Sequence, residues 1–456
     1  MTSKTRKRGG KPINSGGYGC IFKPALRCKG KKRPVKGSVS KLMTKETARR
    51  EMDLVHRIDS KVREIPNYNK YFFTKEFESC TPDRLTKSDL VGFSRMCQNF
   101  KNSGMTARNV NLHLDKLETL TMPDGGEDLS GYLRSVLLTR RLFEFLNNSL
   151  VSVINNAVIP MNNLGVYHLD LKATNVMVTP DDRLKLIDWG ISVIHESNIP
   201  RTLERFPIVF NLPYSSILFN SLFQPYYSDV LKRNPILLNG SREQNDNLRN
   251  AIVDYLYLIN REIGQGHLKY ISIMMARIYL PLVFTHQTQY SSDFISGLTT
   301  DRIVEYIAPI LRRFTVNSKF DSAGYLKVFS KNVDIWGMIT CYDAFMPAIQ
   351  PARNDKLDPL YIGIRNVFID FLFRNPDLEI DTGALSTRLR SLNELKLSTR
   401  QRSKRTRKHR STPRRREYTF EEMTITPTPG DSPISTSTRS LPSLYTGSQL
   451  NNLFSR

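Results

Sequence analysis

The chain has 456 residues, of which 67 are Lys or Arg and 43 are Asp or Glu, so its formal net charge is +24. Hydrophobic residues make up 39% and aromatic residues 10% of the chain, which is enough apolar surface for a folded core and excludes a wholly disordered protein. The length leaves room for two or three folding units.

The positive charge is concentrated near the two ends. Residues 1–36 hold twelve Lys or Arg and no acid, residues 400–416 hold ten, and the rest of the chain has a net charge of only +2. We therefore predict a basic flexible arm over 1–11 and a disordered tail over 398–456, basic at first and then rich in Ser, Thr and Pro. Such flanks are suited to bind nucleic acid or another polyanion. A nuclear-import signal is the alternative.

Between these flanks the pattern changes from strands to helices. Short β-favouring runs over 20–23 and 39–43 predict antiparallel strands, and a helix over 45–58 follows with Thr44 as its N-cap. Pro and Gly interrupt the pattern near residue 123. Beyond it we predict helices over 129–138, 142–164, 248–259, 270–283, 303–312 and 332–373, with short strands over 166–170, 175–178 and 184–187. This order predicts an α+β fold with a β-rich first part and a mostly helical second part.

The five cysteines are an odd number without a C-x-x-C pair, which argues against a disulfide framework and against a zinc site. We expect reduced thiols in a cytosolic compartment. The N-terminus lacks an apolar secretory segment, and the most apolar stretch, 270–284, contains Arg277 and is too short to span a membrane. These features predict an intracellular, cytoplasmic protein without a membrane span, and the basic tail leaves a nuclear location open.

The most informative segment, residues 167 to 190, reads Y-H-L-D-L-K-A-T-N-V-M-V-T-P-D-D-R-L-K-L-I-D-W-G. Phosphoryl transfer from a magnesium nucleotide needs such a set of groups, because its chemistry is mostly positioning and charge neutralisation. Asp170 is suited to accept a hydroxyl proton and Lys172 to neutralise the transferred phosphoryl group. Asn175 and Asp188 offer the oxygen ligands that Mg²⁺ prefers. Each residue alone is more typical of a surface turn, so the assignment depends on their joint spacing.

A glycine-rich run, I-N-S-G-G-Y-G-C-I, occupies residues 13–21. Glycines let backbone amides approach phosphates closely, because a side chain would collide there. Lys41 follows on a predicted strand and Glu51 on the next helix, so the two are placed to form an ion pair that contacts the α- and β-phosphates. Lys36 is the competing lysine, but Pro34 and Gly37 place it in a turn.

Together these motifs resemble those of eukaryotic-type protein kinases. Asp188-Trp189-Gly190 resembles D-F-G, the segment around Met122 resembles the hinge that receives adenine, and Asp334 begins a D-x-W-x-x-G-like element. The resemblance implies a bilobal fold with a small lobe over 12–122 and a large lobe over 123–397, ATP and Mg²⁺ as cofactors, and transfer of phosphate to Ser/Thr hydroxyls of proteins. The implied ATP-binding residues are Ile13, Gly16, Gly17, Tyr18, Gly19, Ile21, Lys41, Glu51 and Met122.

The runs G-G-Y-G-C-I-F-K-P-A-L and V-S-K-L-M are similar to those of serine/threonine kinases of large nucleocytoplasmic DNA viruses, which implies a host-cytoplasm or virion location. Two residues depart from the kinase pattern. Asn14 stands where the first glycine is expected, and Leu169 replaces the Arg of H-R-D, which implies activity independent of activation-loop phosphorylation. The 216–330 region is an insertion or a divergent helical subdomain. An inactive pseudokinase scaffold and a small-molecule kinase are the alternatives.

Overall fold

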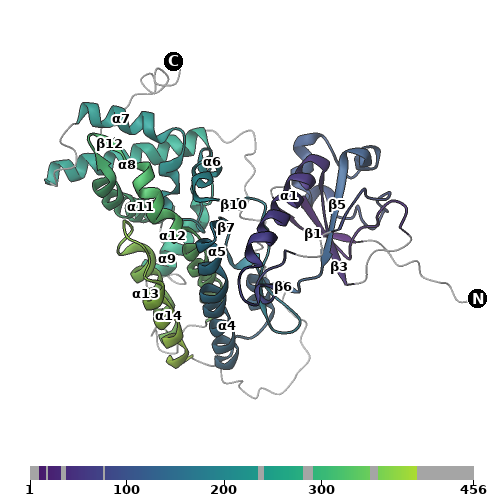
Figure 1. Ribbon diagram of the computed structural model, residues 1–456. Coiled ribbons are helices and arrows are strands. Elements are labelled where there is room, and N and C mark those ends of the chain that lie inside the picture. The colour runs from purple at the N-terminus through teal and green to yellow at the C-terminus, as the bar shows by residue number, and fades with distance from the viewer. Residues whose placement is uncertain are drawn as a thin grey trace, which may run out of the picture. The chain divides into compact units, whose positions relative to one another are not determined.

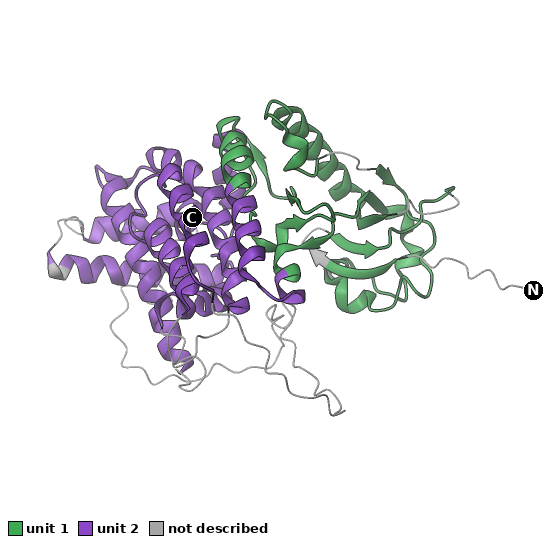
Figure 2. Cartoon of the chain, turned by 90° about the horizontal axis from the view of Figure 1, so that it is seen from below, with its two compact units in different colours: residues 1–132, 152–194 green, residues 133–151, 195–456 purple. Residues whose placement is uncertain are grey.

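The computed structural model (Figure 1) describes residues 10–16, 19–31, 37–74, 78–234, 241–280, 291–349 and 358–397. The chain divides into two compact units (Figure 2). Unit 1 comprises residues 1–132 and 152–194, and unit 2 comprises residues 133–151 and 195–456. Most of the predicted basic arm and the whole predicted tail lie outside the described residues. Within that described part, no helix is both long enough and apolar enough to cross a membrane.

Unit 1 is built on a five-stranded antiparallel sheet with strand order β1-β2-β3-β5-β4. Side chains alternate between the two faces of a strand, so Ser40 and Leu42 of β3 point to one face while Lys41 and Met43 point to the other. Leu42 accordingly packs with Phe22, whereas Met43 packs in a separate apolar cluster. The strands are β1 (Lys11–Gly16), β2 (Gly19–Lys23), β3 (Ser38–Thr44), β4 (Glu78–Cys80) and β5 (Leu117–Pro123).

Helix α1 (Lys45–Val62) covers the face of the sheet that carries Lys41 and Met43. Its N-terminus is capped by Thr44, whose hydroxyl accepts a hydrogen bond from the backbone N–H of Thr47 at 3.3 Å, which confirms the predicted cap. Ala48 of the helix packs against Met43. The buried stripe therefore places this helix face against the lysine side of the sheet.

Two disulfides correct our prediction that the cysteines are reduced. Cys20 of β2 is bonded to Cys97, and Cys28 is bonded to Cys80 of β4. The fifth cysteine, Cys341, is free and buried, which explains the odd number. The partners are 77 and 52 residues apart, so no local spacing motif could reveal them; only the folding of unit 1 brings them together. The cysteine-based argument for a reducing compartment is therefore wrong.

The second half of unit 1 contains short strands around the segment that resembles a catalytic loop. Leu186 joins this half to the chain that follows α1, because its N–H donates to Tyr71 O at 2.7 Å and its carbonyl accepts from Phe73 N at 3.0 Å. Residues 152–194 therefore belong to the same compact unit as the N-terminal sheet. The elements are β6 (Glu127–Asp128), α3 (Leu129–Ser135), α5 (Ile159–Asn163), β7 (Val166–Tyr167), β8 (Val176–Val178), β9 (Leu184–Leu186) and β10 (Val193–Ile194). Strands β6, β8 and β9 form one sheet, and β7 pairs with β10.

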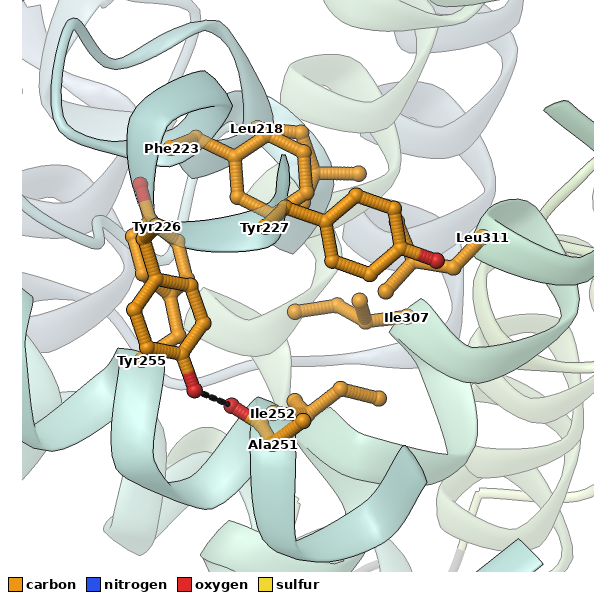
Figure 3. Close-up of a pocket in the computed structure, with 9 residues that line it drawn as sticks. All are labelled: Leu218, Phe223, Tyr226, Tyr227, Ala251, Ile252, Tyr255, Ile307 and Leu311. Carbon is orange, nitrogen blue, oxygen red and sulfur yellow. Dashed lines mark hydrogen bonds between the residues drawn. The ribbon is translucent and has the colours of Figure 1, made fainter. Parts of the chain in front are cut away.

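Unit 2 is mostly helical and has an aromatic core. Tyr226 and Tyr255 stack at 5.3 Å between ring centroids, and Phe223 meets Tyr255 edge-on at 5.0 Å (Figure 3). The Tyr226 hydroxyl donates to Ala251 O at 2.6 Å, so its polar end is satisfied inside the core. The cavity between these side chains measures about 10 Å³, which shows that the region is closely packed. The described parts of the predicted 216–330 segment are thus mostly helical, with one short pair of strands over 315–320.

Two helices of unit 2, α8 (Arg242–Glu262) and α11 (Ser292–Phe314), extend beyond the predicted segments 248–259 and 303–312 at both ends. Helix α8, for example, begins at a capping box in which Ser241 and Gln244 satisfy each other's backbone N–H groups. The elements are α4 (Arg140–Val153), α6 (Ile199–Leu203), α7 (Phe223–Arg233), α8 (Arg242–Glu262), α9 (Leu268–Tyr279), α11 (Ser292–Phe314), β11 (Thr315–Val316), β12 (Lys319–Phe320), α12 (Ser322–Thr340), α13 (Pro359–Phe368) and α14 (Thr382–Ser391). Asp334 is buried within α12.

Candidate active site

A buried lysine connects two carboxylates in unit 1. Lys41 Nζ lies 2.8 Å from both carboxylate oxygens of Glu51 and 3.4 Å from Asp188 Oδ1. Lys41 and Glu51 are 6% and 8% exposed, so their ion pair is shielded from solvent. The arrangement follows from the fold, because the side-chain alternation of β3 turns Lys41 toward the helix that carries Glu51.

Asp188 follows β9 and has a left-handed backbone conformation, with φ of 65°. The residue after it, Trp189, is 1% exposed and holds this turn in place. Its indole Nε1–H donates to Phe73 O at 3.1 Å, and its ring lies against Phe72 and His168 at centroid distances of 5.8 and 4.7 Å. The strained conformation of Asp188 is thus supported by a buried, hydrogen-bonded neighbour.

The loop between β7 and β8 brings together Asp170, Lys172 and Asn175. Lys172 Nζ lies 2.8 and 2.9 Å from the two carboxylate oxygens of Asp170. Asn175 Nδ2 donates to the backbone carbonyl of Asp170 at 2.7 Å and to its Oδ2 at 2.9 Å. These contacts fix the Asp170 carboxylate from two sides while its side chain remains 21% exposed.

His168 supports this loop from the interior. Its Nδ1 accepts from the backbone N–H of Asp170 at 3.3 Å, and its Nε2 lies 2.9 Å from Ile187 O. Leu169, between them, is buried and has φ of 62°, which is uncommon for a residue with a branched side chain. The apolar Leu169 therefore occupies an interior position, where a charged side chain would need a partner.

The charges of the site act on one another. Burial lowers the pKa of Lys41, but the carboxylates of Asp188 and Glu51 outweigh burial and raise that pKa above its ordinary value. Burial raises the pKa of Asp188, but the charges of Lys41, Lys172 and His168 outweigh it and lower that pKa. Burial also raises the pKa of Glu51, against the pull of Lys41. A cationic Lys41 and an ionised Asp188 at neutral pH are what phosphate and metal binding require.

The described residues of the glycine-rich run lie at the end of β1 and the start of β2, where Gly16 pairs with Gly19. A Cβ added to Gly19 would lie 2.9 Å from Lys41 Cγ and 3.0 Å from Leu42 O, so only glycine lets β2 run this close to β3. Ile21 stands opposite Lys41 in that pairing, and Ile13 of β1 is 48% exposed. The expected residues Gly17 and Tyr18 lie outside the described residues.

Met122 lies near the end of β5, paired with Val39 of β3, and packs beside Met43. The chain then turns away through Gly126, whose φ is 97°, and a Cβ there would lie 2.3 Å from Val178 O. Gly126 thus allows the segment after β5 to lie directly on β8, the strand that follows Asn175. The expected adenine-contacting residue and the catalytic-loop residues therefore belong to one compact unit.

The donor set suits Mg²⁺ rather than a metal held by the protein alone. Among the described residues, no group of three or more His, Cys, Asp or Glu side chains is arranged to hold a metal ion. Mg²⁺ is commonly bound by one or two carboxylates together with substrate phosphates, so such a group is not required for it. Asn175 donates through its Nδ2 and keeps its Oδ1 as an oxygen ligand, and Asp188 contributes a carboxylate.

Several groups that support these residues were not predicted from the sequence. Phe72, Phe73 and His168 contact Trp189, and none of them had an expected role. The signal in the sequence was the aromatic run Tyr71-Phe72-Phe73 after the first helix, but its contact with Trp189 spans more than 110 residues of chain. Local sequence patterns cannot reveal a contact between residues so far apart in the chain.

Comparisons with known proteins give a short match. No family model matches the chain. Over 65 residues, 14% of the chain, it is 43% identical to each of two proteins of Dictyostelium discoideum, both described as a probable LIM domain-containing serine/threonine-protein kinase. The matched stretch covers 7% and 10% of these relatives, so the chain shares only a small part of their length. A limited part of this sequence is thus similar to protein kinases.

Proposed function

We propose that the chain is an ATP-dependent protein kinase that transfers the γ-phosphate of Mg-ATP to Ser/Thr hydroxyls of proteins. The observation that carries this proposal is the ion-paired set of Lys41, Glu51 and Asp188 within the same compact unit as Asp170, Lys172 and Asn175. The short similarity to protein kinases agrees with it. The bilobal kinase architecture is part of the same proposal.

Each residue has a role that follows from its contacts. Lys41, cationic and oriented by Glu51, binds the α- and β-phosphates. Asp170, oriented by Lys172 and Asn175, accepts the proton of the attacking hydroxyl. During transfer, the Lys172 ammonium moves from Asp170 to the phosphoryl group, whose negative charge it neutralises.

Asn175 and Asp188 are the residues that would hold Mg²⁺. The ion would supply positive charge that neutralises the phosphates of the nucleotide. Asp188 is suited to this because its lowered pKa keeps it ionised. The charge of Lys172 acts on the ionisation of Asp188, which supports the view that the two sets act on one substrate.

Only the sequence motifs support the closer resemblance to kinases of large nucleocytoplasmic DNA viruses. The intracellular location that this resemblance implies has the same support. Polyanion binding by the basic flanks is a further hypothesis from composition, and most of those residues lie outside the described ones. The catalytic proposal depends on neither of these hypotheses. Deletion of residues 398–456 tests polyanion binding, because unchanged affinity for DNA and RNA at low salt would contradict a role of the tail in that binding.

The test is a comparison of Asp170→Asn with Asp182→Asn in Mg-ATP. Asp182 is an exposed carboxylate in the turn between β8 and β9, and its left-handed φ of 59° is tolerated by Asn, so the control removes the same charge without strain. Removing a general base costs about 10²- to 10⁴-fold in rate, so we expect at least a hundredfold loss of phosphate transfer for Asp170→Asn. Asp182→Asn should retain the wild-type rate.

Phosphate transfer is measured to a basic test protein, with small alcohols as competitors. A wild-type rate in Asp170→Asn would refute the assignment of the base. Nucleotide binding without transfer by the wild-type protein would favour a pseudokinase scaffold. Preferential labelling of the small alcohols would favour a small-molecule kinase.

A further inference from the structure

A second site candidate lies in unit 2, away in sequence from every residue of the proposed active site. It is a pocket of about 240 Å³ between the C-terminal end of α9, the middle of α11 and the helical turn over Ile369–Phe373. At about 30 Å³ per water molecule, this volume equals roughly eight waters, more than a bare oxyanion would fill. The pocket therefore has room for a small organic ligand.

Aromatic rings form its apolar walls. Tyr279 and Phe373 lie with their centroids 6.0 Å apart and their planes tilted by 50°. Tyr306, which is buried, meets Phe373 edge-on at 6.5 Å with an interplanar angle of 84°. Three differently oriented rings offer both faces and edges, the two geometries in which another aromatic ring packs well.

Guanidinium groups supply positive charge at the same place. Arg302 lies over the ring of Tyr279 at 4.5 Å, and its terminal nitrogen pairs with Glu305 at 2.6 Å. Arg374 lines the pocket too and pairs with Asp370 at 2.7 Å. Both arginines therefore line the pocket, and each forms an ion pair with one carboxylate.

Arg365 adds a charge that these carboxylates do not balance. Arg365 stands outside the lining of the pocket and makes no ion pair among the described residues, but its charge acts on the ionisation of Tyr279, which does line the pocket. The Nε–H groups of both Arg302 and Arg365 are buried and find no acceptor in the described part of the chain. A buried donor without an acceptor costs free energy, so an anion that brings oxygen acceptors to this place is favoured.

We propose that this pocket binds a small ligand with one aromatic ring and one anionic group, a carboxylate or a phosphate. The ring packs on Tyr279, Tyr306 and Phe373, and the anion is held by Arg302. The charge of Arg365, from outside the lining, attracts the anion as well. Planar guanidinium groups suit both oxyanions because they donate paired hydrogen bonds. The site is independent of phosphate transfer, so it stands or falls separately from the proposed kinase activity.

The experiment titrates four probes into the full-length protein by calorimetry: phenyl phosphate, benzoate, inorganic phosphate and benzyl alcohol. We expect phenyl phosphate and benzoate to bind at least tenfold more tightly than the probe that lacks the ring and the probe that lacks the charge. Arg302→Gln and Arg365→Gln should each weaken phenyl phosphate binding at least tenfold. Arg261→Gln, which removes an exposed arginine from α8, should leave it unchanged.

Two further measurements keep the outcome decisive. Circular dichroism and the melting temperature show which variants are folded, and either folded arginine variant suffices for the test. Lys41→Met shows whether phenyl phosphate binds at the proposed nucleotide site instead, and we expect no change. The proposal would be overturned if phenyl phosphate does not bind, or if inorganic phosphate or benzyl alcohol binds as tightly as phenyl phosphate. It would also be overturned by wild-type affinity in the folded arginine variants, or by loss of phenyl phosphate binding in Lys41→Met.

Discussion

The disulfide between Cys20 and Cys97 gives a prediction whose size follows from the structure. It closes a loop of 77 residues that contains α1, β3 and the ion pair of Lys41 with Glu51. Because a cross-link restricts the unfolded chain, a loop of this length on its own stabilises the fold by about 4.5 kcal/mol in the chain-entropy model. The Cys28–Cys80 bond lies inside this loop, so with that bond intact the Cys20–Cys97 bond closes roughly 26 residues and contributes about 3.5 kcal/mol. The 52-residue loop closed by Cys28 and Cys80 gives about 4.1 kcal/mol in the same model. Cys20→Ala/Cys97→Ala should therefore lose a large part of the stability of unit 1.

The two tryptophans of the chain allow each unit to be followed alone. Trp189 belongs to unit 1 and Trp336 to unit 2, so Trp336→Phe leaves a reporter for the disulfide-bonded unit. With an m-value of about 2 kcal/mol/M, the loss of about 3.5 kcal/mol lowers the urea midpoint by roughly 1.7 M. Unit 2 contains only the unpaired Cys341, so its transition, followed by Trp336 in Trp189→Phe, should not respond to reductant.

The reasoning would be refuted by equal unit 1 midpoints with and without reductant. It would also be refuted by mass spectrometry that finds all five thiols free in the purified, non-reduced protein. A shift of similar size in Cys28→Ala/Cys80→Ala is expected, since the two loop lengths differ little on a logarithmic scale.

Three other predictions concern the site and unit 2. Glu51→Gln leaves the buried charge of Lys41 without its main partner, which should cost about 3 kcal/mol of stability and at least tenfold in Mg-ATP affinity, measured by urea unfolding and calorimetry. Trp189→Phe keeps the ring but loses the hydrogen bond to Phe73 O, which should cost about 1 kcal/mol and slow phosphate transfer more than it weakens ATP binding. Burial raises the pKa of Tyr227 to about 12, so unit 2 should lose stability as pH rises from the unfolded value near 10 toward 12, by roughly 2.7 kcal/mol for this tyrosine.

Two of these predictions have a matched control variant on the same element or in the same unit. Glu46→Gln removes an exposed carboxylate of α1 and should have no effect on ATP affinity; an equal effect would contradict the role of Glu51. For Trp189→Phe, an unchanged ratio of the transfer rate to ATP affinity would contradict a positioning role. For the alkaline transition, Tyr227→Phe should make the decrease in stability between about pH 10 and 12 smaller by roughly 2.7 kcal/mol, whereas Tyr257→Phe, at an exposed position, should leave the decrease unchanged.

The sign of the alkaline effect follows from the proton balance. The raised pKa means that the folded protein keeps the Tyr227 proton at pH values where the unfolded chain has released it. Unfolding therefore releases a proton between about pH 10 and 12, and rising pH favours the unfolded chain. The stabilising difference is fully present below about pH 10 and is lost as pH passes through the folded value.

Features that depend on neighbours along the chain could be predicted from the residues alone. The alternation in β3, the helix that begins after Thr44, and the spacing of Asp170, Lys172 and Asn175 are all local, because the periods of strands and helices and the reach of a side chain extend over a few residues. These features were sufficient to select the candidate site residues and to place them on strand, helix and loop.

Contacts between distant segments of the chain emerge only when the molecule is folded. The pairing of Cys20 with Cys97, the contact of Trp189 with Phe73 and the inclusion of residues 152–194 in unit 1 all result from strand pairing and packing. Such contacts depend on register and on which faces are buried together, so the same residue types are compatible with many pairings until the core is formed. Five cysteines therefore looked reduced in the sequence, whereas four of them form disulfides in the fold, because their separation along the chain says nothing of their separation in space.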